Sequence, residues 1–62
     1  RREARRSLVL TRGMKAGEVI AKEDLMPKRP GTGIAPTYAD VVIGRAVKDD
    51  LAEDTILTWE MI

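Results

Sequence analysis

The amino-acid sequence predicts a small, irregular, mainly β fold with short helical turns and an internal repeat. The chain has only 62 residues, so it forms one domain whose thin core buries roughly 60% of the unfolded surface. Its apolar residues occur in short runs between turn residues, which is typical of short strands. Its two ends also show the same order of a strand, a turn, an apolar pair and a helical turn, which indicates a repeat.

The expected elements follow each other closely along the chain. Residues 1–6 are polar and resemble the end of a linker, so the domain is expected to span residues 7–62. Pro36 in a first turn and Gly44 at a C-terminal end favour a helix between them, and Thr58 is placed to cap a last turn. In order, we predict a strand over 7–11, a turn over 15–18, a helical turn over 22–26 stopped by Pro27, a loop over 28–36, a helix over 36–43, a strand over 45–48, a turn over 52–55 and a helical turn over 59–62.

A shift of 37 positions lays the first end of the chain on the second. The aligned pairs are Val9 and Ala46, Leu10 and Val47, Met14 and Leu51, Val19 and Ile56, Ile20 and Leu57, Glu23 and Glu60, and Leu25 and Ile62. Identity between the two copies is nearly nil, so chance similarity is the alternative. Two units related by an approximate two-fold axis would share one core. Its expected members are Leu8, Leu10, Met14, Val19, Ile20, Leu25, Val42, Val47, Leu51, Ile56, Leu57 and Ile62.

Composition excludes most catalytic chemistry. The chain has no cysteine and no histidine, which removes disulfides, thiolate nucleophiles, imidazole acid–base catalysis and the usual zinc ligands. So short a chain can hardly wall a dry cleft that would activate its carboxylates or lysines. The acidic residues at 49–50 and 53–54 lack the spacing of a calcium loop and suit turns. We therefore expect no catalytic residue, no cofactor and no metal site in this domain.

Two further classes of partner are not expected. No apolar run approaches the roughly 20 residues of a membrane span, and nothing resembles a signal peptide. Residues 1–29 carry a net charge of +5 and residues 30–62 a net charge of −4, but the chain has only two aromatic residues on which bases might stack. We expect neither membrane nor nucleic-acid binding. The chain does not begin with methionine, which suits a fragment of a longer protein, and the absence of cysteine is compatible with the cytoplasm.

The segment KRPGTGI at 28–34 is the most informative stretch. Pro30 pushes Arg29 towards an extended conformation, and the glycines permit positive φ or a close approach. A guanidinium offers a planar fork of donors for carboxylate, phosphate or amide oxygens. The alternative is an ordinary loop with a solvated arginine, which the spacing alone favours. The segment is not a phosphate-binding loop, because the lysine and helix of that motif are missing.

The sequence resembles a known family in RRSL at 5–8, GEVI at 17–20, EDL at 23–25, KRPGTGI at 28–34 and IGR at 43–45. This order is similar to the C-terminal antifreeze-like (SAF) domain of bacterial sialic acid synthases. The resemblance covers nearly the whole chain, and the Arg-Pro-Gly-x-Gly segment is its most specific part. It implies the β-clip, pretzel-like fold of type III antifreeze proteins, with internal two-fold pseudosymmetry.

The resemblance also implies a function. In such enzymes a (β/α)-barrel condenses phosphoenolpyruvate with an N-acylated amino sugar such as N-acetylmannosamine, using manganese or magnesium. The product is a sialic, legionaminic or pseudaminic acid for polysaccharide biosynthesis in the cytoplasm. The SAF domain caps the active site of the partner subunit in a domain-swapped homodimer. By this resemblance Arg29 contacts the sugar, supported by its loop of Lys28, Pro30, Gly31, Thr32 and Gly33. The barrel is absent, so this chain alone is expected to be inactive.

Two alternative functions share the fold. Type III antifreeze proteins bind ice through a flat, weakly polar face, whose counterpart here spans residues 18–24. That stretch is rich in charged side chains, which hold hydration water and break up an apolar plane. Other SAF modules belong to pilus or flagellar chaperones, which would require a secretion signal upstream.

Overall fold

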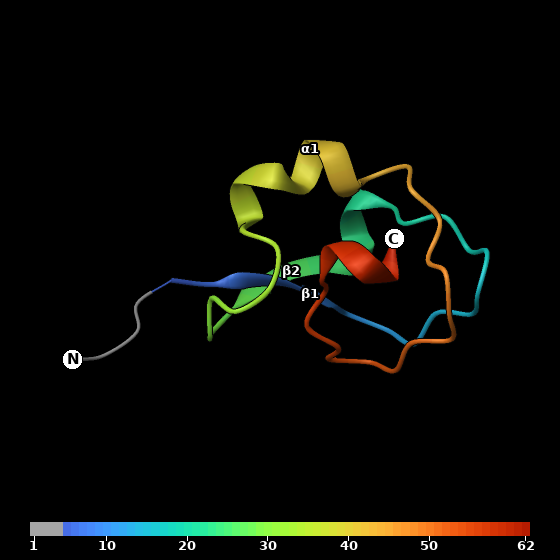
Figure 1. Ribbon diagram of the computed structural model, residues 1–62, viewed down its shortest axis with the longest axis horizontal. Helices are drawn as coiled ribbons and strands as arrows, with labels where there is room; N and C mark the ends of the chain where they lie inside the picture. Colours follow the sequence, from blue (N-terminus) through green and yellow to red (C-terminus); the bar gives the residue numbers. More distant parts are fainter. Residues whose placement is uncertain (1–4) are drawn as a thin grey trace.

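The computed structural model describes residues 5–62, and its regular elements are short (Figure 1). In chain order they are the strand β1 (Ser7–Leu10), the 3₁₀ helix η1 (Lys22–Asp24), the strand β2 (Leu25–Lys28), the 3₁₀ helix η2 (Pro36–Tyr38), the helix α1 (Ala39–Val42) and the 3₁₀ helix η3 (Trp59–Met61). This is a small, mainly β fold with short helical turns, which confirms that part of the predicted fold class. Of the expected linker end, residues 1–4 lie outside the described residues, and Arg5 and Arg6 are exposed before β1.

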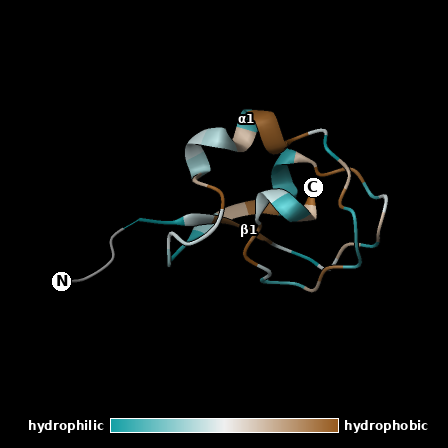
Figure 2. Cartoon of the chain, viewed as in Figure 1, coloured by the Kyte–Doolittle hydropathy of each residue, from teal (hydrophilic) through white to brown (hydrophobic). Residues whose placement is uncertain are grey.

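The strand β1 lies at the centre of the fold because other segments cover it on both edges. On one edge it pairs antiparallel with β2, with Leu10 opposite Leu25. On the other edge the Leu10 N–H donates to the Thr55 carbonyl (3.1 Å) and the Leu57 N–H donates to the Leu8 carbonyl (3.0 Å). All four residues of β1 are consequently buried. Figure 2 shows this hydrophobic strand crossing the middle of the chain, with α1 above it.

Two predicted elements are wrong in part. The helical turn expected over 22–26 ends at Asp24, because the next residues pair with β1 and form β2. Pro27 does not stop that turn but lies within β2, a position proline tolerates because β2 is an edge strand that need not donate from every residue. The strand expected over 45–48 is reduced to a single bridge between Ala46 and Val19, because a turn at 43–44 and a bend at 48–49 leave only a short extended stretch between them.

Backbone hydrogen bonds between the two ends of the chain, and one bond within each end, occur in matching pairs. In each pair, the donors of the two bonds lie 37 positions apart in the sequence, and so do the two acceptors. Each bond is given with its N–H donor first and its carbonyl acceptor second. Between the two ends, Gly17–Val47 (2.8 Å) matches Asp54–Leu10 (2.9 Å), Val47–Glu18 (3.0 Å) matches Leu10–Thr55 (3.1 Å), and Ile20–Arg45 (2.9 Å) matches Leu57–Leu8 (3.0 Å). Within the ends, Thr11–Asp24 matches Lys48–Met61 (both 2.8 Å). Met14 and Leu51 exchange both of their bonds, at 2.8 and 2.7 Å. Two of the three described residues with positive φ, Gly17 (92°) and Asp54 (69°), are also 37 apart, whereas the third, Gly44, lies in the connection.

The core differs from the predicted one at six positions. Val19 was expected inside but is 58% exposed, because its bridge to Ala46 turns its side chain outward and leaves Ile20 inside. Leu25, Leu51 and Ile56 are half-buried. Val9 and Ile34 belong to the buried hydrophobic residues that the prediction missed. The buried hydrophobic residues are Leu8, Val9, Leu10, Met14, Ile20, Ile34, Val42, Val47, Leu57 and Ile62.

The connection between the two ends carries the helices. Pro36 occupies the first turn of η2, α1 follows directly and ends at Val42, and Gly44 reverses the chain with φ of 96°. The predicted helix over 36–43 is therefore confirmed to within one residue, as a 3₁₀ turn followed by an α-turn. Thr58 is the N-cap residue of η3, but its side chain makes no capping hydrogen bond to the backbone.

Candidate functional site

The candidate site is the loop at residues 28–33, here called the Arg29 loop. It begins at the end of β2, where Lys28 lies opposite Ser7, and continues to Gly33. The Arg29–Pro30 peptide bond is cis. Arg29 and Thr32 are exposed, whereas Gly31 and Gly33 are half-buried. The Arg29 side chain has no hydrogen-bond or ion-pair partner within residues 5–62.

One side chain outside the loop holds the loop in place. Ser7 is fully buried, and its Oγ donates to the Pro30 carbonyl at 2.6 Å and accepts from the Gly33 N–H at 2.8 Å. Since buried polar groups need partners, this hydroxyl and these two backbone groups satisfy each other. Sequence reasoning missed Ser7. The available signal was a single hydroxyl at the head of an otherwise apolar strand.

Gly33 is required for a close approach rather than for a positive φ. A Cβ at this position would collide with the Leu57 carbonyl oxygen and lie 2.6 Å from Ile56 Cγ2. The next residue, Ile34, donates its N–H to the same Leu57 carbonyl (2.9 Å) and accepts from the Leu8 N–H (2.8 Å). The end of the loop is thus fixed to the core, and only its outer part faces solvent.

Lys28 adds a weaker tie. Its Nζ lies 2.9 Å from Asp54 Oδ1, across a pair in which both side chains are largely exposed. Exposed ion pairs of this kind contribute about 0–1 kcal/mol. The Lys28–Asp54 ion pair therefore stabilises the start of the loop only weakly.

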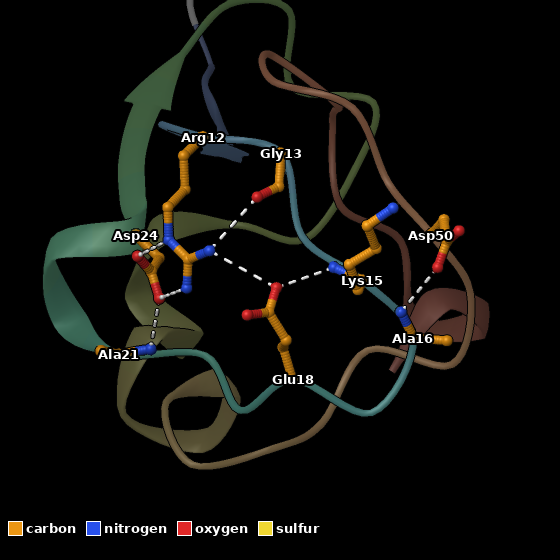
Figure 3. Close-up of polar contacts among 8 residues, drawn as sticks. All are labelled: Arg12, Gly13, Lys15, Ala16, Glu18, Ala21, Asp24 and Asp50. Atoms are coloured by element: carbon orange, nitrogen blue, oxygen red, sulfur yellow. Dashed lines mark hydrogen bonds and ion pairs between the residues drawn. The ribbon is translucent and has the colours of Figure 1, made fainter.

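A second polar cluster lies around Arg12, at the far end of β1 (Figure 3). The Arg12 Nε donates to Asp24 Oδ1 (2.9 Å), and the Ala21 N–H donates to Asp24 Oδ2 (2.9 Å). These bonds hold the pKa of the nearly buried Asp24 carboxyl below its ordinary value. Arg12 also reaches Glu18 Oε1 (3.4 Å), which accepts from the Lys15 N–H (2.7 Å). Arg12 thus pairs with both carboxylates, and these contacts join residues 12, 18 and 24 at this corner of the fold.

The predicted turn acids stay at turns. Asp50 accepts from the Ala16 N–H (2.8 Å), and Asp54 pairs with Lys28. In the part of the chain that the structure describes, no group of three or more acidic side chains gathers as a metal site would require. Across the same residues, no helix has the length and apolar character needed to cross a bilayer.

Both aromatic side chains lie on the surface and touch each other. The rings of Tyr38, at the end of η2, and Trp59, at the start of η3, are 5.8 Å apart at an interplanar angle of 73°. They are 50% and 46% exposed. This edge-to-face contact joins the helical connection to the C-terminal turn.

Comparison with known proteins places the chain in one family. Residues 5–62 match the family model of the SAF domain. Over 58 residues the chain is 45% identical to the N,N'-diacetyllegionaminic acid synthase of Legionella pneumophila, a match that covers 94% of the chain and 16% of that protein. It is 41% identical over 58 residues to an uncharacterised protein of Methanocaldococcus jannaschii, covering 94% of the chain and 17% of that protein. The chain therefore spans about one-sixth of the length of these relatives.

Proposed function

This chain belongs to the SAF domain family, and we propose that it is the domain that caps the active site of a sialic acid synthase-type enzyme. In this proposal the enzyme condenses phosphoenolpyruvate with an N-acylated amino sugar, and Arg29 contacts the sugar. The observation that carries the proposal is an exposed arginine, without a partner among residues 5–62, on a loop anchored to the core of a chain 45% identical to part of a legionaminic acid synthase.

Catalysis is assigned to the part of the protein outside this chain. The chain contains no cysteine or histidine, and the match covers only 16% of the similar synthase. A divalent metal, manganese or magnesium, belongs in the proposal to a barrel domain, because the described carboxylates of this chain do not converge on a common point. This chain contributes binding and closure. Since phosphoenolpyruvate is a cytoplasmic metabolite, the proposal places the protein in the cytoplasm.

The chemistry of Arg29 suits the proposed ligand. A guanidinium stays charged at any working pH and has five N–H donors, which match the N-acyl carbonyl and the hydroxyls of an amino sugar. Those donors are not used within residues 5–62. The Ser7 and Gly33 contacts hold the loop backbone, so the arginine is presented from a fixed base rather than a free loop.

The internal repeat, in this proposal, supplies the scaffold for that loop. The paired hydrogen bonds support two related halves, 8–25 and 45–62, arranged about an approximate two-fold axis near Met14 and Leu51. The segment between the halves, 26–44, contains the Arg29 loop, η2 and α1. The binding loop thus belongs to the connection, whereas the two halves form the core that carries it.

The test is the substitution Arg29→Ala in the full-length protein. It should lower kcat/KM for the amino sugar about 10- to 100-fold, the effect of losing one charge-assisted hydrogen bond, and leave KM for phosphoenolpyruvate unchanged. Arg29→Lys should restore only part of the loss, because an ammonium lacks the planar fork. The matched control is Arg45→Ala, which removes an exposed arginine outside the loop. Equal effects of Arg29→Ala and Arg45→Ala would refute the proposed role.

The proposed homodimer has its own test. If Arg29 acts on the partner subunit's active site, mixing the Arg29→Ala protein with a protein inactivated in its barrel should yield hybrid dimers with one intact composite site. Activity should then recover as hybrids form. Hybrids that are demonstrably present but inactive would contradict action in trans.

A further inference from the structure

We propose that Ser7 is the positioning residue for Arg29. Its hydroxyl holds the Arg29 loop in the shape that presents the guanidinium to the amino sugar. This inference rests on the function proposed above and extends it to a residue that lies 22 positions before the arginine in the sequence.

The hydroxyl of Ser7 has a geometry that suits this role. It is fully buried, and it donates to the Pro30 carbonyl (2.6 Å) while accepting from the Gly33 N–H (2.8 Å). One oxygen thus joins both sides of the loop, three residues apart. The other residues of β1 are Leu8, Val9 and Leu10, so no other side chain of this strand can make these bonds.

The position of Arg29 depends on these bonds because they hold the loop backbone from which its side chain extends. Within residues 5–62 the guanidinium has no partner, so among these residues only the loop backbone, through the position of the Arg29 Cα atom, determines the region that the side chain can reach. Pro30 follows Arg29 directly, and its carbonyl is one of the two groups that Ser7 holds. Without the hydroxyl, this carbonyl and the Gly33 N–H lose a buried partner, and the loop must move to solvate them.

Ser7→Ala in the full-length protein is the first test. It should lower kcat/KM for the amino sugar about 10-fold, with KM for phosphoenolpyruvate unchanged, since one hydrogen-bonded hydroxyl is lost. Ser7→Cys keeps the shape but hydrogen-bonds weakly, and it should act in the same direction if the alanine variant folds poorly. The matched control is Thr11→Val. The Thr11 hydroxyl also donates to a backbone carbonyl, that of Glu23 (2.9 Å), but at the opposite end of β1, so its loss should leave the sugar parameters unchanged.

A double-mutant cycle separates positioning from general stabilisation. If Ser7 acts through Arg29, then Ser7→Ala should have no further effect on the sugar parameters in the Arg29→Ala background. Effects that multiply would overturn the inference, as would a Ser7→Ala protein whose sugar kinetics match those of Thr11→Val.

Hydrogen–deuterium exchange of the full-length protein distinguishes this inference from the proposed function. Peptides covering residues 28–34 should exchange faster in Ser7→Ala than in Thr11→Val. Unchanged exchange would overturn the positioning role whatever the kinetics. Faster exchange in Ser7→Ala, together with an Arg29→Ala protein of normal activity, would instead refute the sugar contact of Arg29 and with it the role of Ser7 towards the sugar.

Discussion

Gly33 lies so close to the Leu57 carbonyl oxygen that no side chain fits between them. Directly after it, the Ile34 N–H donates to that same carbonyl at 2.9 Å. The Arg29 loop is thereby joined to the C-terminal half of the chain, 24 positions further along the sequence. The conformation of the proposed binding loop and the stability of the core are therefore linked at one contact.

This contact predicts that Gly33→Ala destabilises the chain. The added methyl group must push the Leu57 backbone away, which costs about 1–3 kcal/mol in a well-packed interior. Gly13→Ala is the matched control, because a Cβ there would meet its nearest atom, the Leu51 carbonyl oxygen, at an ordinary 3.5 Å. Urea unfolding measures both. Equal midpoints for the two variants would contradict the close packing at Gly33.

Val19 and Ile20 are neighbours with opposite environments, 58% and 1% exposed. Ile20→Ala should lower the free energy of unfolding by about 2–5 kcal/mol, because it leaves a cavity in the core. Val19→Ala should change it by no more than about 0.5 kcal/mol, as is usual at the surface. Thermal melts of the two variants test this assignment. A Val19→Ala protein as unstable as the Ile20→Ala protein would contradict the exposed position of Val19.

The lowered pKa of the Asp24 carboxyl predicts that the chain loses stability in acid. Its folded-state pKa lies below the ordinary value of 3.8, first because Arg12 donates to it and then because the Ala21 N–H does. The stabilisation is complete well above pH 3.8 and is lost as the pH falls through the folded-state pKa. Asp24→Asn should therefore be less stable than the unmodified chain at pH 7, and the difference should shrink below pH 3.8.

Urea unfolding at a series of pH values from 7 downward measures this difference. Glu23→Gln, which removes an exposed carboxylate from the same turn, is the matched control and should follow the unmodified chain. Some acid sensitivity should persist in Asp24→Asn, because the pKa of Glu60 is also lowered, by its own backbone N–H and the Thr58 hydroxyl. A constant difference between Asp24→Asn and the unmodified chain at every pH would refute the Arg12–Asp24 account.

Ice binding predicts a different outcome from the proposed function. Residues 18–24 present the exposed side chains of Val19, Lys22 and Glu23 beside the charged Arg12 cluster, so they form no flat apolar plane. We expect the purified chain to show no thermal hysteresis. Arrest of ice-crystal growth would revive the antifreeze interpretation.

Local signals were sufficient for several elements. The proline and glycine at positions 36 and 44 delimit η2 and α1 because their backbone preferences act within a few residues. The strand β1 was recognisable from its apolar run. The Arg29 loop was recognisable from its glycines and proline. The sequence could not say at which glycine a side chain would not fit; at Gly33 it does not fit because the Leu57 carbonyl lies too close.

The sequence by itself determined that the fold is small and mainly β with short helical turns, and that cysteine and histidine chemistry is absent, since these follow from composition and short-range preferences. Tertiary structure decided that Leu25 and Met26 join a strand, that Val19 faces out while Ile34 lies in the core, and that Ser7 lies beneath the Arg29 loop. Each of these outcomes depends on partners far along the chain. The Ser7 contacts span 23 and 26 positions, a distance over which side-chain periodicity carries no information.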